Sequence, residues 1–299
     1  LTALRFFAAF AVLLSHLAFL KDQQNPLHGL ANTIFYEGYA GVTFFFVLSG
    51  FILSHTYQSK VSSKEVSGRK YFLLRLARIY PLHFLTALPF AIIAFYKLGA
   101  SAFSKVALNT MLLQSWVPES RFYYSLNSVS WSLSNELFFY ASFIFLTTLS
   151  SRVLGRIAIV WVIVILFAAI VGIYTGRSSW HDGRVHYLFY ISPVTRLLDF
   201  VVGMMVYRWS STHGYGKTSF HEIASVAILI GAMYVFSTHQ LPNVLRSQLL
   251  YLPLMAYIVW SFAGGGGLIS RAIAHPSIVL LGDASFALYM IHQPIITHG

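Results

Sequence analysis

The sequence predicts an all-α membrane protein, a polytopic bundle of about nine to ten transmembrane helices. Hydrophobic residues make up 57% of the 299 residues, and only 10% are charged, whereas about a quarter are charged in a typical soluble domain. The mean hydropathy is +0.67. Long apolar stretches recur along the whole chain, so neither a signal peptide nor a single anchor accounts for them. The chain has no cysteine, which excludes disulfides, thiolate metal sites and a cysteine nucleophile.

A spanning helix needs about 20 mostly apolar residues. On that template the predicted spans are residues 3–20, 38–56, 80–98, 129–149, 156–174, 190–208, 222–238, 247–263 and 277–297. Residues 102–116 add a short or re-entrant helix, and the glycine run 264–267 reads as a flexible cytoplasmic linker. We expect one transmembrane domain over residues 1–299. Because the chain begins at Leu1 rather than at a methionine, we expect both ends to be trimmed.

Charge sets the predicted orientation. The loop 57–79 holds six basic residues against the single acid Glu65, so we expect it to be cytoplasmic. Residues 21–37, 99–128, 175–189 and 239–246 then lie outside. The net charge of +11 fits loops that face anionic lipid better than it fits nucleic acid. We therefore expect membrane lipid, and no nucleic acid, as a partner.

The outer segments combine aromatic and polar residues. They contain Trp116, Tyr123, Tyr124, Trp180, His181, Asp182, Arg184 and His186. Such a mixture suits an interfacial aromatic belt, which is the general rule, and it also suits a surface that contacts carbohydrate. The sequence leaves both interpretations open.

Arg5 and His16 are the first ionisable groups inside a predicted span, where each costs about 2.5–3.5 kcal/mol on insertion scales. They are 11 residues apart in LTALRFFAAFAVLLSHL, so they share one helix face and lie roughly 16 Å apart along the axis. Taken alone, the pair also fits a simpler interpretation. Arg5 would then reach the headgroups and His16 would be a packing residue.

Two further segments follow along the chain. In the second span Ser49 stands beside Gly50, and small residues there usually indicate helix packing. Arg75 and Arg78 are one helical turn apart before Pro81. Two guanidinium groups so placed can hold phosphate groups, although ordinary cytoplasmic charge explains them equally well.

Three polar positions remain in later spans. Glu136 follows Trp131, Ser132 and other polar residues in SVSWSLSNELFFY, and a carboxylate at the edge of an apolar span needs a histidine or arginine partner. Arg196 and Asp199 are three residues apart and can neutralise each other within one helix. His292 is a weaker candidate, with Pro294 kinking or ending the helix behind it.

Taken in order, these segments resemble the acyltransferase-3 family of membrane O-acyltransferases, from residue 1 to about residue 295. The matching motifs are Arg5 with His16, Gly41 to Phe51, Arg75 with Arg78, Ile79 and Pro81, Trp131 to Glu136, Arg196 with Asp199, Phe200 and Gly203, and Leu281 to Pro294. Family members often carry an acidic or amide residue where Thr43 stands, which leaves Glu37 or no residue to supply that polarity.

The resemblance implies an enzyme, an O-acyltransferase of the bacterial cytoplasmic (inner) membrane. Cytoplasmic acyl-CoA, most commonly acetyl-CoA, would donate an acyl group to a hydroxyl of a carbohydrate, such as an exopolysaccharide or lipid-linked glycan. His16 would act as base, Glu136 would orient it, and Arg75 and Arg78 would bind the CoA phosphates. Arg5 would assist, and Trp131, Ser132, Ser49, Arg196, Asp199 and His292 would support the site or bind substrate. No metal and no permanently bound cofactor is expected.

Two other classes of function fit the same polar residues. A transporter or flippase for a lipid-linked sugar would line its path with them, although the sequence shows no internal repeat of the kind many transporters have. A sensor without chemistry would hold them as self-satisfied pairs. Whether transfer is direct or passes through acyl-His16 also stays open.

Overall fold

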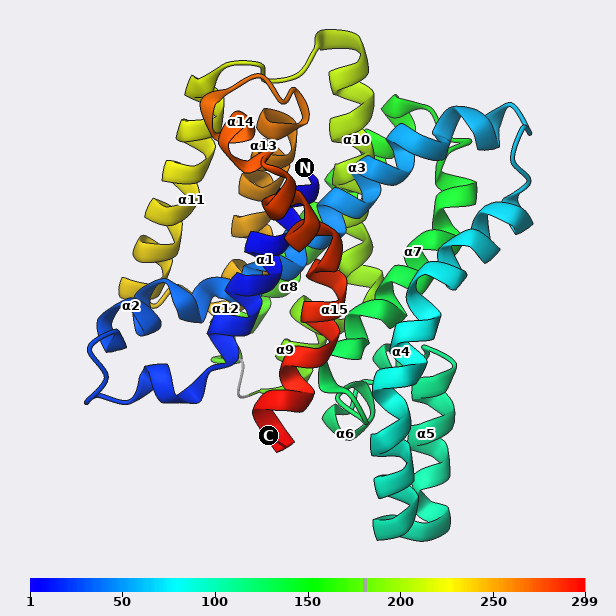
Figure 1. Ribbon diagram of the computed structural model, residues 1–299, viewed down its shortest axis with the longest axis vertical. Coiled ribbons are helices and arrows are strands. Elements are labelled where there is room, and N and C mark those ends of the chain that lie inside the picture. Colours follow the sequence, from blue (N-terminus) through cyan, green and yellow to red (C-terminus); the bar gives the residue numbers. More distant parts are fainter. Residues whose placement is uncertain (180–181, 299) are drawn as a thin grey trace. The chain divides into compact units, whose positions relative to one another are not determined.

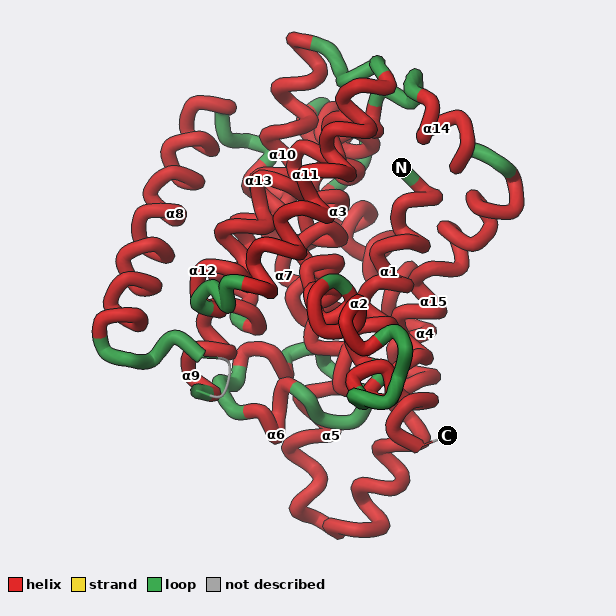
Figure 2. The backbone as a smooth tube through the Cα atoms, turned by 90° about the vertical axis from the view of Figure 1, so that its left-hand side faces the viewer, coloured by secondary structure: helices red, strands yellow, loops and turns green. Residues whose placement is uncertain are grey.

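The computed structural model describes residues 1–179 and 182–298, and within these ranges it contains helices and no strand (Figure 2). Trp180 and His181, two of the outer residues singled out in the sequence, lie outside the described residues. The predicted all-α class is confirmed for the described part of the chain.

Nine longer helices, counted over residues 1–179 and 182–298, carry most of the fold, and each is labelled in Figure 1. They are α1 (Thr2–His16), α3 (Gly41–Ser62), α4 (Gly68–Leu98), α7 (Trp131–Leu146), α8 (Ser151–Tyr174), α10 (Pro193–His213), α11 (Ser219–Thr238), α13 (Tyr251–Ala263) and α15 (Pro276–His298). The short α-helices are α2 (His28–Thr33), α5 (Phe103–Thr110), α6 (Ser120–Tyr123), α9 (Gly183–His186), α12 (Asn243–Leu245) and α14 (Leu268–Ile273). The 3-10 segments are η1 (Ala18–Lys21), η2 (Phe35–Ala40), η3 (Gly99–Ala102), η4 (Gln114–Trp116) and η5 (Ser128–Ser130). Two π-helical segments, η6 (Tyr187–Ile191) and η7 (Arg246–Leu250), precede α10 and α13.

Each predicted span overlaps one of these longer helices, yet fewer of the helices reach the length of a membrane crossing. Among the described residues, six continuous helical segments are long and apolar enough: His28–Ser62, Gly68–Thr110, Ser151–Tyr174, Gly183–His213, Ser219–Thr238 and Pro276–Thr297. The helix α1 is apolar but shorter, and α7 and α13 have 16 and 13 residues. The count of nine to ten spans is therefore not confirmed.

The predicted cytoplasmic loop 57–79 is much shorter in the structure. The helix α3 continues to Ser62, and α4 begins at Gly68, where the Ser67 hydroxyl accepts a hydrogen bond from the backbone N–H of Lys70 at 3.2 Å. That capping bond starts the helix before the apolar stretch, so counting apolar residues places the boundary too late. Arg75 and Arg78 consequently lie on α4.

The helices α4 and α15 both continue through a proline. Pro81 lies inside α4 and Pro294 inside α15. Of the two alternatives expected for Pro294, an end of the helix is wrong, since α15 extends to His298, and a kink stays a prediction. A proline removes one backbone donor, and membrane helices tolerate that loss where neighbours satisfy the freed carbonyl group.

The chain divides into two compact units. The first unit contains Leu1–Ile52 and Asp199–Tyr289, and the second contains Leu53–Leu198 and Met290–Gly299. The boundaries fall inside α3, α10 and α15. The single domain expected from the sequence stays a prediction.

Within the first unit, the backbones of α3 and α10 touch at two glycines. A Cβ atom on Gly203 would lie 1.9 Å from the carbonyl oxygen of Val47, and one on Gly50 would lie 2.0 Å from that of Phe200. No real side chain fits at such distances. The small residues of the second predicted span therefore serve helix packing.

The glycine run 264–267 is a packed turn and not the flexible linker that was expected. A Cβ atom on Gly264 would lie 2.4 Å from the carbonyl oxygen of Gly216, and one on Gly267 would lie 2.2 Å from the Glu222 carboxylate. That carboxylate accepts hydrogen bonds from the backbone N–H groups of Gly267 and Ser270, at 3.1 and 3.0 Å. The glycines are thus required for close approach.

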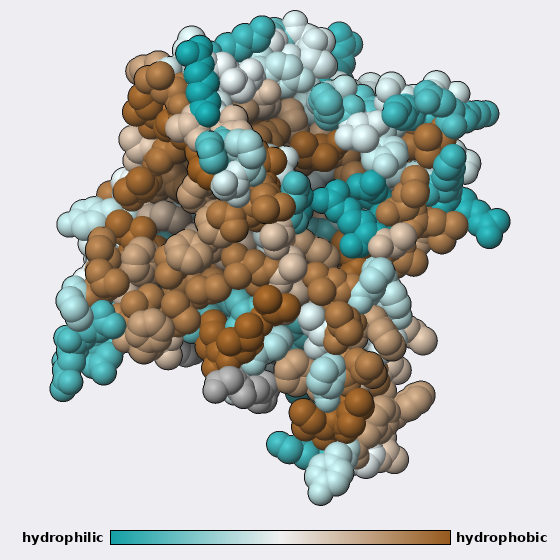
Figure 3. All heavy atoms as spheres, viewed as in Figure 1, coloured by the Kyte–Doolittle hydropathy of each residue, from teal (hydrophilic) through white to brown (hydrophobic). Residues whose placement is uncertain are grey.

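In the second unit, α8 exposes large apolar side chains along its length. Ile159, Phe167 and Ile170 are each more than 60% exposed, and the most apolar 18-residue stretch of the helix has a mean hydropathy of 3.0. Hydrophobic atoms also cover much of the face seen in Figure 3. Apolar exposure on this scale would favour aggregation in water, and it fits contact with lipid.

Candidate functional site

The helix α1 carries the first two candidate residues. Arg5 is half-buried, whereas His16 is exposed and is the last residue of the helix. Beyond it Leu17 takes an extended backbone and η1 follows, so the expected helix 3–20 is too long. The Ser15 hydroxyl and the His16 ring both bond to the carbonyl oxygen of Val12. Such local side-chain bonds satisfy carbonyl groups at a helix end.

The bond to Val12 determines the tautomer of His16. Its Nδ1 lies 2.8 Å from the Val12 carbonyl oxygen, and because a carbonyl oxygen can only accept, Nδ1 must carry the proton. The neutral ring then has its lone pair on Nε2. In the neutral ring, Nε2 is therefore the nitrogen that can accept a proton.

The segment η2 and the start of α3 hold α1 in place within the first unit. A Cβ atom on Gly38 would lie 2.0 Å from the carbonyl oxygen of Ala11, and one on Gly41 would lie 2.8 Å from that of Ala8. The two backbones are in direct contact in the half of α1 that leads to His16. Movement of η2 would therefore move the candidate base.

A buried ionic cluster connects η2 to the second sequence segment of the unit, Asp199–Tyr289. Glu37 has no exposed surface, and its carboxylate accepts an Arg246 N–H at 2.7 Å and the hydroxyls of Tyr39 and Tyr251 at 2.9 and 2.6 Å. Arg246 also donates to Asn243 and to the carbonyl oxygen of Phe236. Sequence reasoning missed Arg246; the signal was an arginine at the edge of a predicted span.

Asp199 lies on α10 and is fully buried. The Gln248 side-chain amide donates to its Oδ1 at 2.8 Å, and this partner was not predicted. Arg196 lies on the same helix in the second unit, so its pairing with Asp199 stays a prediction. Ser49 is half-buried on α3 beside the close-packed Gly50, which agrees with a packing role.

In the second unit, Arg75 is held at one end of α4. Its Nη2 donates to the Tyr57 hydroxyl at 2.8 Å, and its guanidinium carbon lies 4.8 Å from the centre of the Tyr57 ring. Arg78 follows one turn later and is exposed. The Tyr71 ring packs between those of Tyr57 and Phe143, with centroids 5.2 and 5.1 Å away. One arginine is thus fixed in position and the next is open to an anion.

Glu136 lies half-buried on α7 and accepts a hydrogen bond from the Tyr140 hydroxyl at 2.5 Å. The Tyr140 hydroxyl, one helical turn further along α7, thereby fixes the position of the Glu136 carboxylate. His16 belongs to the first unit and Glu136 to the second, so the predicted bond between them stays a prediction.

The second unit brings Trp131 and Arg196 to the same ring. The indole of Trp131 lies 5.0 Å from the Tyr190 ring centre, and the Arg196 guanidinium lies 5.5 Å from it. Trp131 and Arg196 are both buried, as are Ser132 on α7 and His292 on α15. Two of the sequence motifs therefore converge around Tyr190, which the sequence did not single out.

A buried polar network lies at the start of α7. Its members are Asn109, Gln114, Ser115, Ser125, Asn127, Ser130, Ser134 and Asn135, all buried. Asn109 and Gln114 both donate to the Ser130 hydroxyl, at 3.3 and 3.2 Å, and the His83 ring bonds to the carbonyl oxygen of Asn109 at 2.9 Å. Asn127 donates to the Met290 carbonyl oxygen on α15 at 2.9 Å. These bonds fix the end of the unit that carries Trp131.

The metal-ligating side chains of the described residues are not grouped as a metal site requires. Within residues 1–179 and 182–298 no group of three or more histidine, aspartate or glutamate side chains is placed to hold one. A phosphate-bearing ligand could instead be held by Arg75 and Arg78, since guanidinium groups match phosphate oxygens in charge and geometry.

Helices long and apolar enough to cross a membrane, together with large exposed apolar side chains, indicate an integral membrane protein. Its family follows from comparison with known sequences. The chain belongs to the acyltransferase-3 family: residues 1–297 match the family described as an acyltransferase domain. The resemblance drawn from the sequence motifs is confirmed, and the protein is an O-acyltransferase.

A curated relative agrees with this assignment. The chain is 30% identical over 322 residues to "Acyltransferase MdmB" from Streptomyces mycarofaciens, with 100% of this chain and 79% of the relative covered. No solved structure matches the chain. The comparisons give membrane acyl transfer as the activity and leave the donor and the acceptor to be identified.

Proposed function

We propose that this protein transfers an acetyl group from cytoplasmic acetyl-CoA to a hydroxyl of a carbohydrate, in the cytoplasmic membrane of a bacterium. The observation that carries the proposal is the geometry of His16. Its Nδ1–H is committed to the Val12 carbonyl oxygen, which leaves the basic lone pair on Nε2. A histidine so prepared is the usual base for deprotonating a hydroxyl near neutral pH.

The acceptor hydroxyl gives its proton to His16 Nε2 while its oxygen attacks the carbonyl carbon of the thioester. The carbon–sulfur bond breaks, and the CoA sulfur leaves with the proton that His16 had taken. Arg5 assists from the other end of the same helix face. Glu136 orients the ring and stabilises its charged form, as a third group does for other histidine bases.

Arg75 and Arg78 hold the CoA phosphates in this proposal. The support is the fixed guanidinium of Arg75, bonded to the Tyr57 hydroxyl at 2.8 Å, with the exposed Arg78 one turn away. Asp199, Ser49, Ser132 and His292 position the surrounding helices.

The test replaces both arginines with glutamine in the detergent-purified protein. Acetyl transfer from radiolabelled acetyl-CoA to a panel of methyl glycosides should show a KM for acetyl-CoA raised by about tenfold or more, since each charged hydrogen bond lost costs about 1.5–3 kcal/mol. Arg69→Gln, an exposed arginine of the same helix, is the control and should leave it unchanged. A rise in the acceptor KM alone would remove the pair from the donor site, and wild-type protein that transfers nothing would reject acetyl-CoA and a simple glycoside as donor and acceptor.

A further inference from the structure

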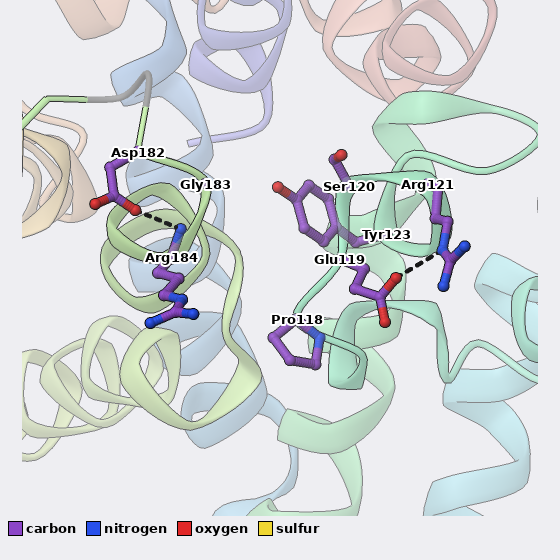
Figure 4. A pocket seen from close by; sticks show the side chains of 8 residues that line it. All are labelled: Pro118, Glu119, Ser120, Arg121, Tyr123, Asp182, Gly183 and Arg184. Carbon is purple, nitrogen blue, oxygen red and sulfur yellow. Dashed lines mark hydrogen bonds and ion pairs between the residues drawn. The ribbon is translucent and has the colours of Figure 1, made fainter.

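A groove of about 650 Å³ opens in the second unit between the segment 118–123 and the start of α9. Its lining residues are Pro118, Glu119, Ser120, Arg121, Tyr123, Asp182, Gly183 and Arg184 (Figure 4). The two segments form opposite walls, and the hydroxyl end of Tyr123 faces the space between them in Figure 4. The volume falls in the range of about 300–1,000 Å³ that is usual for small-molecule sites.

The polar groups of the groove carry balanced charge. Two carboxylates, Glu119 and Asp182, stand with two guanidinium groups, Arg121 and Arg184. Glu119 pairs with Arg121 at 2.6 Å, but the side chains are 49% and 65% exposed, so solvent screens the pair and it contributes little to stability. A ligand can therefore displace it. A balanced set of donors and acceptors favours a neutral ligand with many hydroxyls over a phosphate or a carboxylate.

One tyrosine, Tyr123, lines the groove, and further aromatic rings lie beside it. The Tyr123 ring lies 4.6 Å from that of Tyr124, whose hydroxyl bonds to the His186 ring at 2.6 Å. Tyr124 is 38% exposed and nearby Trp116 is 40% exposed. Tyr123 is only 2% exposed, and burial raises the pKa of its hydroxyl. A tyrosine hydroxyl is a hydrogen-bond donor at neutral pH in any case, and it is the group that Tyr123 offers to the groove. Rings that are apolar on their faces and polar at one end suit the two sides of a sugar.

A series of ring contacts leads from the groove to the motifs that contain Trp131 and Arg196. The His186 ring lies 6.2 Å from Tyr123 and 5.4 Å from Tyr190, and Tyr190 contacts Trp131 and Arg196 as described above. The groove therefore adjoins the start of α7. The other end of α7 meets the start of α4, where Ile144 lies 3.2 Å from a Cβ atom placed on Gly68.

The helix α7 separates these two ends of the unit. Its 16 residues correspond to about 24 Å. Arg75 lies toward the α4 start and the groove lies at the opposite end. Within this unit, then, the candidate donor-binding arginine and the groove are on different sides, as a reaction between a cytoplasmic donor and an outer acceptor requires.

We propose that the groove binds the acceptor as a neutral polyhydroxylated ring, with Glu119 and Asp182 accepting hydrogen bonds from neighbouring hydroxyls and the Tyr123 hydroxyl, which faces the groove in Figure 4, donating to another. The role as acceptor site rests on the proposed function. The inference that the groove binds such a ring does not depend on the proposed function.

The first experiment measures binding without any acyl donor. Methyl glycosides of glucose, galactose, mannose and rhamnose, and the anionic methyl glucuronide, are titrated against the full-length protein in detergent by saturation-transfer NMR. At least one neutral glycoside should bind. Asp182→Asn and Glu119→Gln should each weaken it about fivefold to tenfold, because a charge-assisted hydrogen bond is about twice as strong as a neutral one.

Asp22→Asn is the matched control. Asp22 Oδ1 accepts the backbone N–H of Gln24 at 3.0 Å, the same local bond that Asp182 Oδ1 makes with Arg184 N–H at 3.0 Å. Both asparagine variants keep that acceptor, so only the charge in the groove changes. Binding to Asp22→Asn should equal that of the wild type.

The second experiment repeats the comparison as acetyl transfer, and it separates the two proposals. If the groove variants raise the acceptor KM while donor hydrolysis stays unchanged, the proposed function and the acceptor groove are both supported. Glycoside binding that Asp182→Asn weakens, with no transfer from acetyl-CoA, supports the groove and rejects the proposed function. Transfer with an acceptor KM that no groove variant changes rejects the groove alone. Absence of binding by all four neutral glycosides, or tighter binding of the glucuronide, also overturns the inference.

Discussion

The buried pair of Glu37 and Arg246 gives the sharpest prediction for stability. Replacing Arg246 with methionine keeps the side chain's length and removes its charge, while the Glu37 carboxylate stays fully buried with only two tyrosine hydroxyls as donors. Loss of one partner of a buried pair costs about 3–5 kcal/mol, because an uncompensated charge remains. For a chain of this size about 2 °C corresponds to 1 kcal/mol, so we expect the melting temperature to fall by about 6–10 °C.

The assay follows intrinsic fluorescence during heating of the detergent-purified protein. Arg121→Ala is the control, because the Arg121–Glu119 pair is exposed and contributes at most about 1 kcal/mol. The double variant Glu37→Gln with Arg246→Met should recover much of the lost stability, since neither charge is then left alone. Equal shifts in melting temperature for Arg246→Met and Arg121→Ala would refute the reasoning. So would a double variant that is less stable than Glu37→Gln alone and Arg246→Met alone.

Two further predictions concern packing and the donor end. Gly203→Ala should abolish monodisperse protein in size-exclusion chromatography, because its Cβ would overlap a carbonyl oxygen of α3, whereas Gly231→Ala, with nothing within 4 Å of its Cβ, should behave like the wild type; a normal profile for Gly203→Ala would contradict the close contact. Tyr57→Phe removes the hydroxyl that holds Arg75 and should raise the KM for acetyl-CoA about threefold to tenfold, and an unchanged KM would show that this bond does not position the arginine.

Helical periodicity was enough to place Arg5 and His16 on the same face of one helix, since residues three turns apart must share a face. It could not show that the helix stops at His16. Leu17, Phe19 and Leu20 continue the apolar composition after the backbone has left the helix. The same limit applies to α4, whose start depends on a capping serine rather than on hydrophobicity.

Contacts between distant segments were beyond a single sequence. Glu37 and Arg246 are 209 residues apart, and neither residue's position along the chain indicates the other. The groove is similar: its aromatic and charged residues were visible in the outer segments, but whether they formed a belt or a site depended on the segments 118–123 and 182–184 coming together. The sequence predicted which residue types matter, and the fold decides which of them meet.

The central claim is that His16 is the base for acyl transfer. The most direct measurement compares acetyl transfer from radiolabelled acetyl-CoA to methyl glycosides by the wild type, by His16→Ala and by His239→Ala, an exposed histidine of the same unit. The account predicts a fall of about 10²- to 10⁴-fold for His16→Ala, an unchanged melting temperature, and wild-type transfer for His239→Ala. Transfer by His16→Ala at the wild-type rate would contradict it.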